Sequence, residues 1–558
     1  MGVENGPFPG ADPGSRTPIN SPREICRVKA GPRQSSQGAV NDWDPASSLM
    51  LYDDEHLFIC LLAIGISSSE AAVMLKITSH VYPWVAWLGE LLLFILVTQA
   101  ALKPATPPVF KNQPFNIFWA APTMYCKHFF NVNLNLQVFN IISNPLETQH
   151  GSTIAIFYPN ELGYYPYFSQ DKESFNGGIP QNMSLSKHLR KAAKDIAEAV
   201  PWWRSVGLVV IDWESWKPQW DRNWGSKIIY KKHSFTFTRN HHPDWSETKV
   251  QTVAQQQFEN AGRSFMNVTL TLALEMRPKC LWGFYLYPDC YNYDYRINPE
   301  MYTGNCPNDE IIRNDQLLWL WEKSTALYPS IYLDKILKSS LNALKFVHYR
   351  VREAMRIAEM ARQDYVLPVF VFSRPFYLHS IEALSQEDLV HTIGESAALG
   401  AAGIILWGGY SYSASKENCL SVQQSIQGSL GRYAVNVTSA AELCSESLCN
   451  NHGRCVRKTP ESSSYLHLPE SSGKKYIQNK SFRFIISENI KLNIITDMKN
   501  GFVCHCYYGW HGQSCHYQTS ELPKEKNKAP TAKYNLSVFL SMVLSVIQLK
   551  SCCPLLKC

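Results

Sequence analysis

Short apolar segments alternate with stretches of helical periodicity through most of this chain, and this alternation restricts the fold more than any other feature. Seven strand candidates occur between residues 103 and about 437, at 116–121, 153–158, 207–214, 282–287, 329–332, 368–373 and 403–407. Apolar residues at helical spacing lie between them, at 185–196, 254–265 and 347–358. Repeated strand-helix units predict a parallel sheet, either open or closed into a barrel.

One strand candidate ends in two carboxylates. Residues 208–211 are all apolar, which is typical of a strand buried on both faces. Side chains alternate along a strand, so Asp212 and Glu214 share one face while Trp213 points the other way. Two close carboxyls in a partly apolar site do not both ionise easily, so one stays protonated near neutral pH. A general acid for glycoside cleavage has this property.

The alternative is that Asp212 and Glu214 cap a helix or pair with Arg222. The following residues favour the catalytic interpretation, because four tryptophans recur in DWESWKPQWDRNW at 212–224. Indole rings offer flat apolar faces for stacking on sugars, although some of these four must belong to the core.

Several longer motifs carry a resemblance: WAAP at 119–122, GIPQN at 178–182, LWGFYLYPDCYN at 281–292, ALYPSIY at 326–332 and GESAALGAAG at 394–403. From about Lys103 to about Gln518 the chain resembles the hyaluronidase family of glycoside hydrolases, and within it the sperm-surface members. The resemblance implies an α/β fold: a distorted (β/α) TIM-like barrel with fewer than eight strands (103–437), followed by a small disulfide-rich EGF-like domain with an insertion (440–518). Catalytic groups of such barrels lie at the carboxyl ends of the strands, where Asp212 and Glu214 fall.

The resemblance implies an endo-β-N-acetylhexosaminidase that hydrolyses the 1,4 linkages between N-acetylglucosamine and glucuronate in hyaluronan, with retention and with attack by the substrate's own N-acetyl group. In this mechanism Glu214 donates the proton and then acts as base, and Asp212 orients the acetamide. The alternatives are a chondroitin-preferring hydrolase, and a catalytically weak protein for matrix binding or sperm-egg adhesion in fertilization.

Further site residues follow from matched motifs. By resemblance, Tyr332 and Tyr285 line the cleavage site, with Tyr332 contacting the acetamide, and Trp407 walls the same pocket. Arg350 matches an arginine at the substrate groove, where it would meet a uronic carboxylate; a structural ion pair is the equal alternative. Lys217 departs from the family, which usually has arginine before Pro218.

Sixteen cysteines and several glycosylation sequons indicate the secretory pathway. The sequons are Asn182, Asn267, Asn436, Asn479 and Asn535. The family pattern implies the disulfides Cys126–Cys419, Cys290–Cys306, Cys444–Cys455, Cys449–Cys504 and Cys506–Cys515. Cys280 has no obvious partner. No metal or cofactor motif occurs, so none is implied.

The two ends of the chain differ from the middle in composition. Residues 1 to about 55 are rich in Gly, Pro, Ser and charge, and we expect residues 1–73 to form a disordered extension. Residues 74–100 resemble a signal peptide or signal anchor. A polar spacer and hydrophobic tail occupy 519–558, which favours a glycosylphosphatidylinositol anchor over secretion or palmitoylation. The expected protein is a cell-surface or secreted monomer. Its partners are hyaluronan and, as a second substrate, chondroitin. The net charge of +6 suits an acidic polymer, and no nucleic-acid motif occurs.

Overall fold

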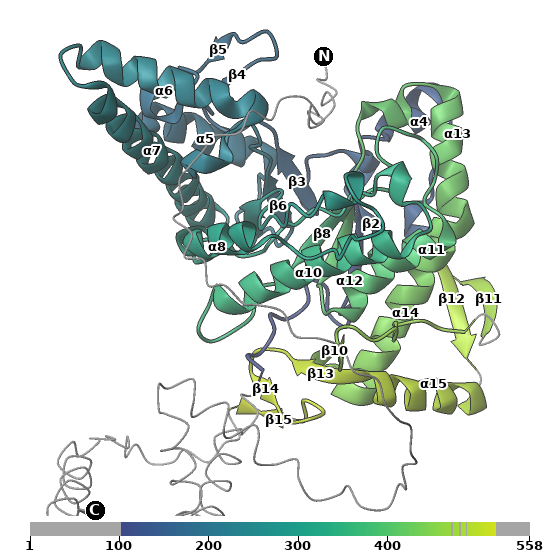
Figure 1. Cartoon of the computed structure of the whole chain (residues 1–558). Helices are drawn as coiled ribbons and strands as arrows, with labels where there is room; N and C mark the ends of the chain where they lie inside the picture. Colours follow the sequence, from purple (N-terminus) through teal and green to yellow (C-terminus); the bar gives the residue numbers. More distant parts are fainter. Residues whose placement is uncertain (1–101, 470–472, 479–480, 487, 520–558) are drawn as a thin grey trace, which may run out of the picture. The chain divides into compact units, whose positions relative to one another are not determined.

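A computed structural model describes residues 102–469, 473–478, 481–486 and 488–519 (Figure 1). The expected extension, the signal segment and all but the first residue of the tail lie outside these ranges, as do Asn479 and Asn535. Within the described part, no helix combines the length and apolar composition needed to cross a bilayer.

Seven parallel strands form the centre of the fold. They are β1 (Asn116–Trp119), β2 (Ile141–Ser143), β3 (Ile154–Phe157), β6 (Leu208–Ile211), β7 (Leu281–Phe284), β8 (Phe370–Ser373) and β9 (Gly403–Leu406). One sheet has the order β2-β1-β9-β8 and the other β3-β6-β7. The first strand therefore pairs with the last, from Asn116 opposite Gly403 to Trp119 opposite Leu406. A barrel has such a pairing, because its first and last strands are neighbours.

Two irregular junctions join the sheets. At the first, the segment 326–330 lies between β7 and β8 and makes only single bridges, among them Ser330 with Phe372. The expected strand 329–332 is therefore wrong as a continuous element, because Pro329 has no N–H to donate to a ladder. At the second junction, between β2 and β3, the buried side chain of Asn144 takes the place of the backbone hydrogen bonds of a strand ladder. It donates to the Ile154 carbonyl (2.7 Å) and accepts from the amides of Thr153 and Ile154.

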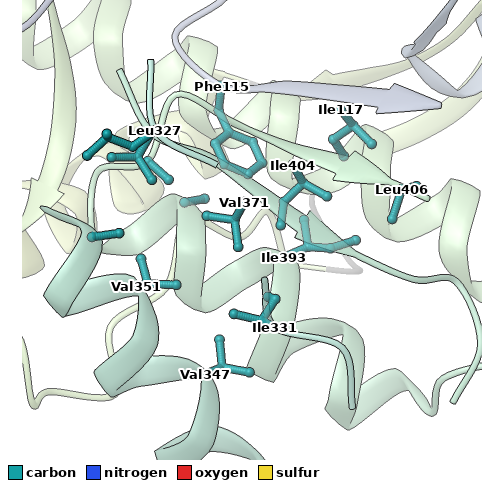
Figure 2. Packing of buried hydrophobic residues seen from close by; sticks show 14 of the residues in the cluster. Phe115, Ile117, Leu327, Ile331, Val347, Val351, Val371, Ile393, Ile404 and Leu406 are labelled. Atoms are coloured by element: carbon teal, nitrogen blue, oxygen red, sulfur yellow. The ribbon is translucent and has the colours of Figure 1, made fainter. Parts of the chain in front are cut away.

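Strand side chains divide between two cores. Leu208 and Val210 belong to a cluster inside the barrel, whereas Val209, Ile211 and Trp213 belong to the cluster between strands and helices. Figure 2 shows the outer cluster, where Val371 of β8 and Ile404 of β9 lie near Val347 and Val351 of helix α10. This alternation confirms the predicted two-sided burial and the opposite direction of Trp213.

Eleven helices surround the strands among the described residues up to 449. They are α4 (Met124–Phe130), α5 (Leu185–Ala199), α6 (Ile228–His241), α7 (Glu247–Met276), α8 (Asn308–Gln316), α9 (Leu318–Trp321), α10 (Leu341–Met360), α11 (Gln386–Leu389), α12 (Glu395–Ala398), α13 (Lys416–Ser425) and α14 (Gly431–Cys449). The predicted helices at 185–196, 254–265 and 347–358 correspond to α5, α7 and α10. A small hairpin of β4 (Tyr167–Phe168) and β5 (Ser174–Phe175) precedes α5.

The C-terminal module has its own strands. They are β10 (Gly453–Arg457), β11 (Gly473–Gln478), β12 (Ser481–Ile486), β13 (Phe502–Cys506), β14 (Trp510–His511) and β15 (Tyr517–Gln518), with helix α15 (Glu488–Gly501). The insertion between Cys455 and Cys504 thus contains the β11-β12 hairpin and α15. The expected domain boundary at 437–440 falls inside α14, so one helix belongs to both parts.

Five disulfides form in the described part, and they are the same pairs that the family pattern implies. They are Cys126–Cys419, Cys290–Cys306, Cys444–Cys455, Cys449–Cys504 and Cys506–Cys515. Cys280 is buried and unpaired, and its thiol contacts the carbonyl of Ser205. Burial raises the pKa of the Cys280 thiol to about 11, which keeps it protonated and unreactive.

A buried ion pair connects the module to the barrel. Arg457 of β10 donates to both carboxylate oxygens of Glu395 on α12 (2.9 and 2.8 Å), and His348 of α10 contacts the same carboxylate at 2.7 Å. Glu395 is fully buried. Burial by itself would raise the pKa of Glu395, but the hydrogen bonds from His348 and Arg457 outweigh it and hold that pKa below its usual value.

We expect Arg457→Met to lower the free energy of unfolding by about 3–5 kcal/mol, because it leaves the Glu395 charge buried without its partner. The matched control is Arg352→Met, which removes an exposed pair with Glu461 on the same two parts of the chain and should cost at most about 1 kcal/mol. Urea denaturation with intact disulfides measures both. Equal losses in the two variants would contradict the assignment.

Candidate active site

Five side chains share one end of the barrel because each is the first residue after a strand. Tyr158, Asp212, Tyr285, Arg374 and Trp407 follow β3, β6, β7, β8 and β9 respectively. The strand ends are in register within each sheet: Ile211 pairs with Phe157 and Phe284, and Ser373 pairs with Leu406. The carboxyl ends of the strands therefore present these five groups together, as expected for the catalytic end of a barrel.

The backbone holds Asp212 firmly at this edge. Its amide donates to the Phe157 carbonyl (2.9 Å), and the Tyr285 amide donates to the Ile211 carbonyl (2.9 Å). Because Leu208 and Val210 face the barrel interior, the alternation carries Asp212 onto the same interior side. The structure thus places this carboxyl above the inner core, with 8% of its surface exposed.

Asp212 and Glu214 act on each other. Burial is the largest influence on both and raises the pKa of each. The neighbouring Glu214 charge and a hydrogen bond between the two carboxyls raise the pKa of Asp212 further. Two such groups titrate as a unit, and the first proton to bind is shared between them. The pair therefore carries one proton at a pH where isolated carboxyls are ionised.

One oxygen of this pair has no neighbour to satisfy it. Asp212 Oδ1 is buried and lacks a hydrogen-bond partner among the described residues. A buried carboxylate oxygen without a donor costs free energy, since it has lost water and gained nothing in return. An N–H group arriving from a ligand would satisfy this oxygen.

Two lysines stand next to the acids. The Lys227 ammonium donates to the backbone carbonyls of Glu214 and Ser215. Burial lowers the pKa of Lys227 to about 8. Lys217 is also buried, with its Nζ 4.2 Å from the centre of the Tyr287 ring. Both positive charges oppose the effect of burial on Glu214 and so limit the rise in its pKa.

Aromatic rings wall the same region. Tyr332 stacks on Trp407 with ring centres 5.8 Å apart, and Tyr285 lies 6.2 Å from Tyr332. All three contact the inner core cluster. The guanidinium of Arg374 lies over both Tyr332 and Trp407, at 5.8 and 5.3 Å. Three of the residues matched by motif are therefore brought together within one aromatic wall.

Sequence reasoning missed Tyr158, Arg374 and Lys227. The Tyr158 hydroxyl accepts from the Trp407 indole at 3.0 Å and from Gln149 at 3.0 Å. Tyr158 ends the predicted strand 153–158 and Arg374 follows the predicted strand 368–373, so their position at the carboxyl end of a strand was a usable signal. Lys227 carried no such signal, because a turn and the short helix at 225–227 bring it back to Glu214.

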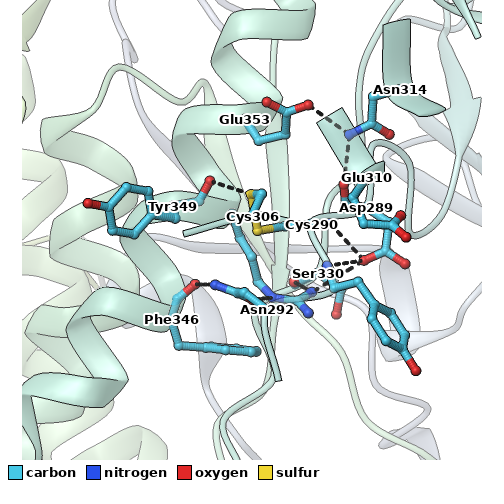
Figure 3. A network of polar contacts seen from close by, with 12 residues as sticks. Asp289, Cys290, Asn292, Cys306, Glu310, Asn314, Ser330, Phe346, Tyr349 and Glu353 are labelled. Atoms are coloured by element: carbon cyan, nitrogen blue, oxygen red, sulfur yellow. Dashed lines mark hydrogen bonds and ion pairs between the residues drawn. A yellow bond between two sulfur atoms is a disulfide. The ribbon is translucent and has the colours of Figure 1, made fainter. Parts of the chain in front are cut away.

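A polar network that includes Asp289 and Asn292 surrounds the Cys290–Cys306 disulfide (Figure 3). Arg350 is a buried partner of this network. It is 4% exposed and donates to Asn292 Oδ1 (2.8 Å) and the Ser330 carbonyl (3.0 Å). Asp289 is 3.8 Å away, and Asn314 Nδ2 joins the Asp289 carbonyl to the carboxylate of Glu353. This environment favours the structural ion pair over direct contact with a substrate carboxylate. Arg350 instead supports the segment that leads to Tyr332.

The four tryptophans of the 212–224 motif separate by role. Trp213 and Trp216 are core residues that stack against Tyr165, at 4.6 and 5.3 Å. Trp220 is half-buried against the core, and only Trp224 is exposed, with 47% of its surface accessible. Arg222 forms its ion pairs with Asp289 and Glu310 and not with Asp212 or Glu214. This excludes the alternative in which the two acids pair with Arg222.

The described sequons differ in access. Asn182 is exposed, whereas Asn267 and Asn436 are half-buried on helices α7 and α14. The Asn436 amide also holds the backbone of Leu468 through two hydrogen bonds (2.7 and 2.8 Å). Asn182 therefore offers the most accessible acceptor of the three.

Known proteins share both the sequence and this architecture. A family model described as hyaluronidase matches residues 104–519. A hyaluronidase from Cerastes cerastes is 49% identical over 434 residues, which are 77% of this chain and 97% of the relative. One from Bitis arietans is 51% identical over 414 residues, which are 74% of this chain and 92% of the relative.

The same family includes a solved structure. Bee venom hyaluronidase, crystallised in complex with a hyaluronic acid tetramer, aligns with a TM-score of 0.52 and 33% identity. The alignment covers 57% of this chain and 98% of the bee protein. With the family model matched across the barrel and the C-terminal module, this chain belongs to the hyaluronidase family of glycoside hydrolases.

Proposed function

We propose that this protein cleaves hyaluronan at linkages within the polymer. In this proposal it is a retaining endo-β-N-acetylhexosaminidase, and the acetamide of the substrate is the nucleophile. The observation that carries the proposal is the acid pair: Glu214 and Asp212 are both buried and hydrogen-bond to each other, and the Oδ1 of Asp212 has no hydrogen-bond partner among the described residues. Support for the substrate comes from the relatives, which are named hyaluronidases, and from the hyaluronic acid tetramer bound to the bee enzyme.

The arrangement of the acids argues against a protein nucleophile. A retaining pair needs carboxyls about 5–5.5 Å apart on opposite sides of the bond, and an inverting pair needs about 6.5–9.5 Å. Asp212 and Glu214 are two residues apart at one strand end and hydrogen-bond to each other. They therefore approach a sugar from one side, which leaves the nucleophile to the substrate.

In the first step the acetamide oxygen attacks the anomeric carbon while the glycosidic C–O bond breaks. Glu214 gives its proton to the leaving oxygen. In the second step water adds to the anomeric carbon, Glu214 takes a proton from that water, and the bond to the acetamide oxygen breaks. Two displacements at one carbon restore the original configuration.

Asp212 directs both the acetamide and the shared proton. The acetamide N–H donates to Oδ1, the oxygen that lacks a donor in the free protein. A hydrogen bond to an ionised carboxylate favours its charged form, so substrate binding lowers the pKa of Asp212 and transfers the shared proton to Glu214. The negative charge on Asp212 then stabilises the positive charge that develops on the acetamide.

Aromatic side chains complete the pocket in this proposal. Tyr332 contacts the acetamide, and Tyr285 and Trp407 form the wall against which the sugar ring packs. Trp224, exposed near the carbonyls that Lys227 holds, offers a further stacking surface along the polymer. Arg350 acts as a positioning residue beneath Tyr332.

The disulfides support passage of this protein through the secretory pathway. The apolar tail Leu536–Leu549 supports attachment to the cell surface by a glycosylphosphatidylinositol anchor. A monomer is sufficient for the chemistry, since one chain supplies the whole site. Three further parts of the proposal rest on the family resemblance alone. They are chondroitin as a second substrate, a location on the sperm surface and a role in fertilization.

Glu214→Gln should lower kcat on hyaluronan by about 10²–10⁴-fold, the usual contribution of a general acid, while leaving the thermal unfolding midpoint unchanged. Release of new reducing ends measures turnover, with Glu322→Gln, an exposed carboxylate, as control. A variant that retains most of its turnover would refute the assignment. A wild type that binds hyaluronan without cleaving it would favour the adhesion alternative, and faster cleavage of chondroitin would change the preferred substrate.

Hyaluronan from which the N-acetyl groups have been removed should bind but not be cleaved, because it lacks the nucleophile. Inhibition of normal cleavage by this polymer measures its binding, and reducing-end release measures its hydrolysis. Partial re-acetylation should restore cleavage. Hydrolysis of the deacetylated polymer would instead require a nucleophile from the protein.

The pH profile should respond to Lys227. Glu214 must be protonated to act, so kcat/KM falls as pH rises through its pKa, and the Lys227 charge lowers that pKa. Removing the charge in Lys227→Met should therefore move the alkaline limb to higher pH. Lys227→Arg retains the charge and should keep the limb near that of the wild type. An alkaline limb that stays in place in both variants would show that Lys227 does not act on Glu214.

A further inference from the structure

A second group of exposed aromatic side chains lies far from the acid pair in the fold. The loop 201–206 connects α5 to β6 and contains Trp202, Trp203 and Val206, which are 72%, 58% and 49% exposed. Single exposed apolar residues are ordinary on protein surfaces, but two adjacent tryptophans are costly to leave in water. The mechanism uses none of these residues.

The loop is held in place while its indoles remain uncovered. The Ser205 amide donates to the Trp202 carbonyl (3.0 Å), which closes a turn, and Arg277 donates to the carbonyls of Val200 and Pro201 at the base of the loop. The Arg204 guanidinium lies 4.7 Å from the centre of the Trp203 ring. The two rings are therefore presented outward by a supported backbone.

The loop lies at the amino end of the strands, because it leads directly into β6. Its Ser205 carbonyl accepts from Cys280, which precedes β7, and Thr325 in turn donates to the Cys280 carbonyl (3.2 Å). The acid pair is at the other end of the same strand. The tryptophan loop and the candidate active site therefore lie at opposite ends of the barrel.

The C-terminal module reaches the same amino end. Arg362 donates to the Ser324 carbonyl (2.9 Å), next to Thr325, and the nearby Tyr365 ring packs on Tyr508 of the module at 6.2 Å. The last described residue, Thr519, donates to the Gly509 carbonyl (2.9 Å), immediately after Tyr508. The described chain thus ends on the side of the barrel that carries Trp202 and Trp203.

We propose that the loop 201–206 is a membrane-contact surface that seats Trp202 and Trp203 in the interface of the lipid bilayer to which the chain is attached. Indoles prefer this interface, where their apolar rings and N–H groups are both satisfied. Arg204 and the exposed Lys279, one residue before Cys280, match the phosphates of lipid headgroups. In the sequence, the apolar tail 536–549 follows Thr519, the described residue at the amino end of the barrel.

This inference rests on the proposed anchor but not on the proposed hydrolysis. Its consequence is an orientation: the amino end of the barrel faces the membrane and the acid pair faces the surrounding matrix. A long polymer can then enter the site without crossing the bilayer surface.

The test uses the full chain purified from cells and reconstituted into phosphatidylcholine vesicles with either brominated or ordinary acyl chains. Bromine quenches tryptophans that lie in the membrane interface, so the difference between the two vesicles reports contact. Trp202→Phe/Trp203→Phe retains apolar rings but removes the indoles, and Trp224→Phe is the matched control at the opposite end. Tryptophans elsewhere are common to all samples and cancel in the comparison.

We expect bromine-dependent quenching in the wild type and in Trp224→Phe, and loss of most of it in the double variant, with hyaluronan turnover of the double variant unchanged. Equal quenching in all three proteins would overturn the loop contact while leaving the anchor intact, and would leave a protein partner as the explanation for the exposed pair. If the wild type does not float with the vesicles, the anchor and the contact are both wrong. Neither result bears on hydrolysis, which is measured separately.

Discussion

The rest of the structure depends on the burial of the strands on both faces. Each strand sends alternate side chains into an inner core and into the layer beneath the helices, so a shift by one residue would exchange the two sets. This constraint fixes the register of the strands, and therefore the position along the barrel axis at which each strand ends. It also explains the close approach at Gly283 of β7, where an added Cβ would lie 2.3 Å from the Ala326 carbonyl.

The candidate active site is a consequence of that register. Strands that end together bring their following residues together, and the alternation turns Asp212 toward the interior while it sends Trp213 outward. Burial then changes the chemistry, since a carboxyl above an apolar core cannot easily ionise beside another carboxyl. The lysines at 217 and 227 moderate this effect. The site is thus a property of the barrel more than of any one motif.

The two ends of the barrel present different groups of side chains. The carboxyl end holds the acids and the aromatic wall, and the amino end receives the C-terminal module and presents Trp202 and Trp203. The module is joined to the barrel through α14 and through the buried pair of Arg457 and Glu395. The proposed polymer site and the proposed membrane contact use opposite ends of the barrel, and the fold provides this separation.

The sequence by itself determined the strand-helix alternation, the opposite directions of Asp212 and Trp213, and three long helices, because these depend on periodicity within one segment. The disulfide pairs and the aromatic wall were reachable only by family resemblance, since spacing does not specify partners across the chain. Tertiary structure alone decided the rest. It showed that Pro329 interrupts an expected strand and that the Asn144 side chain connects the end of β2 to β3. It also showed that Arg350 is buried and that Lys227 returns to Glu214. Each of these depends on contacts between residues from different segments, and local pattern carries no record of such contacts.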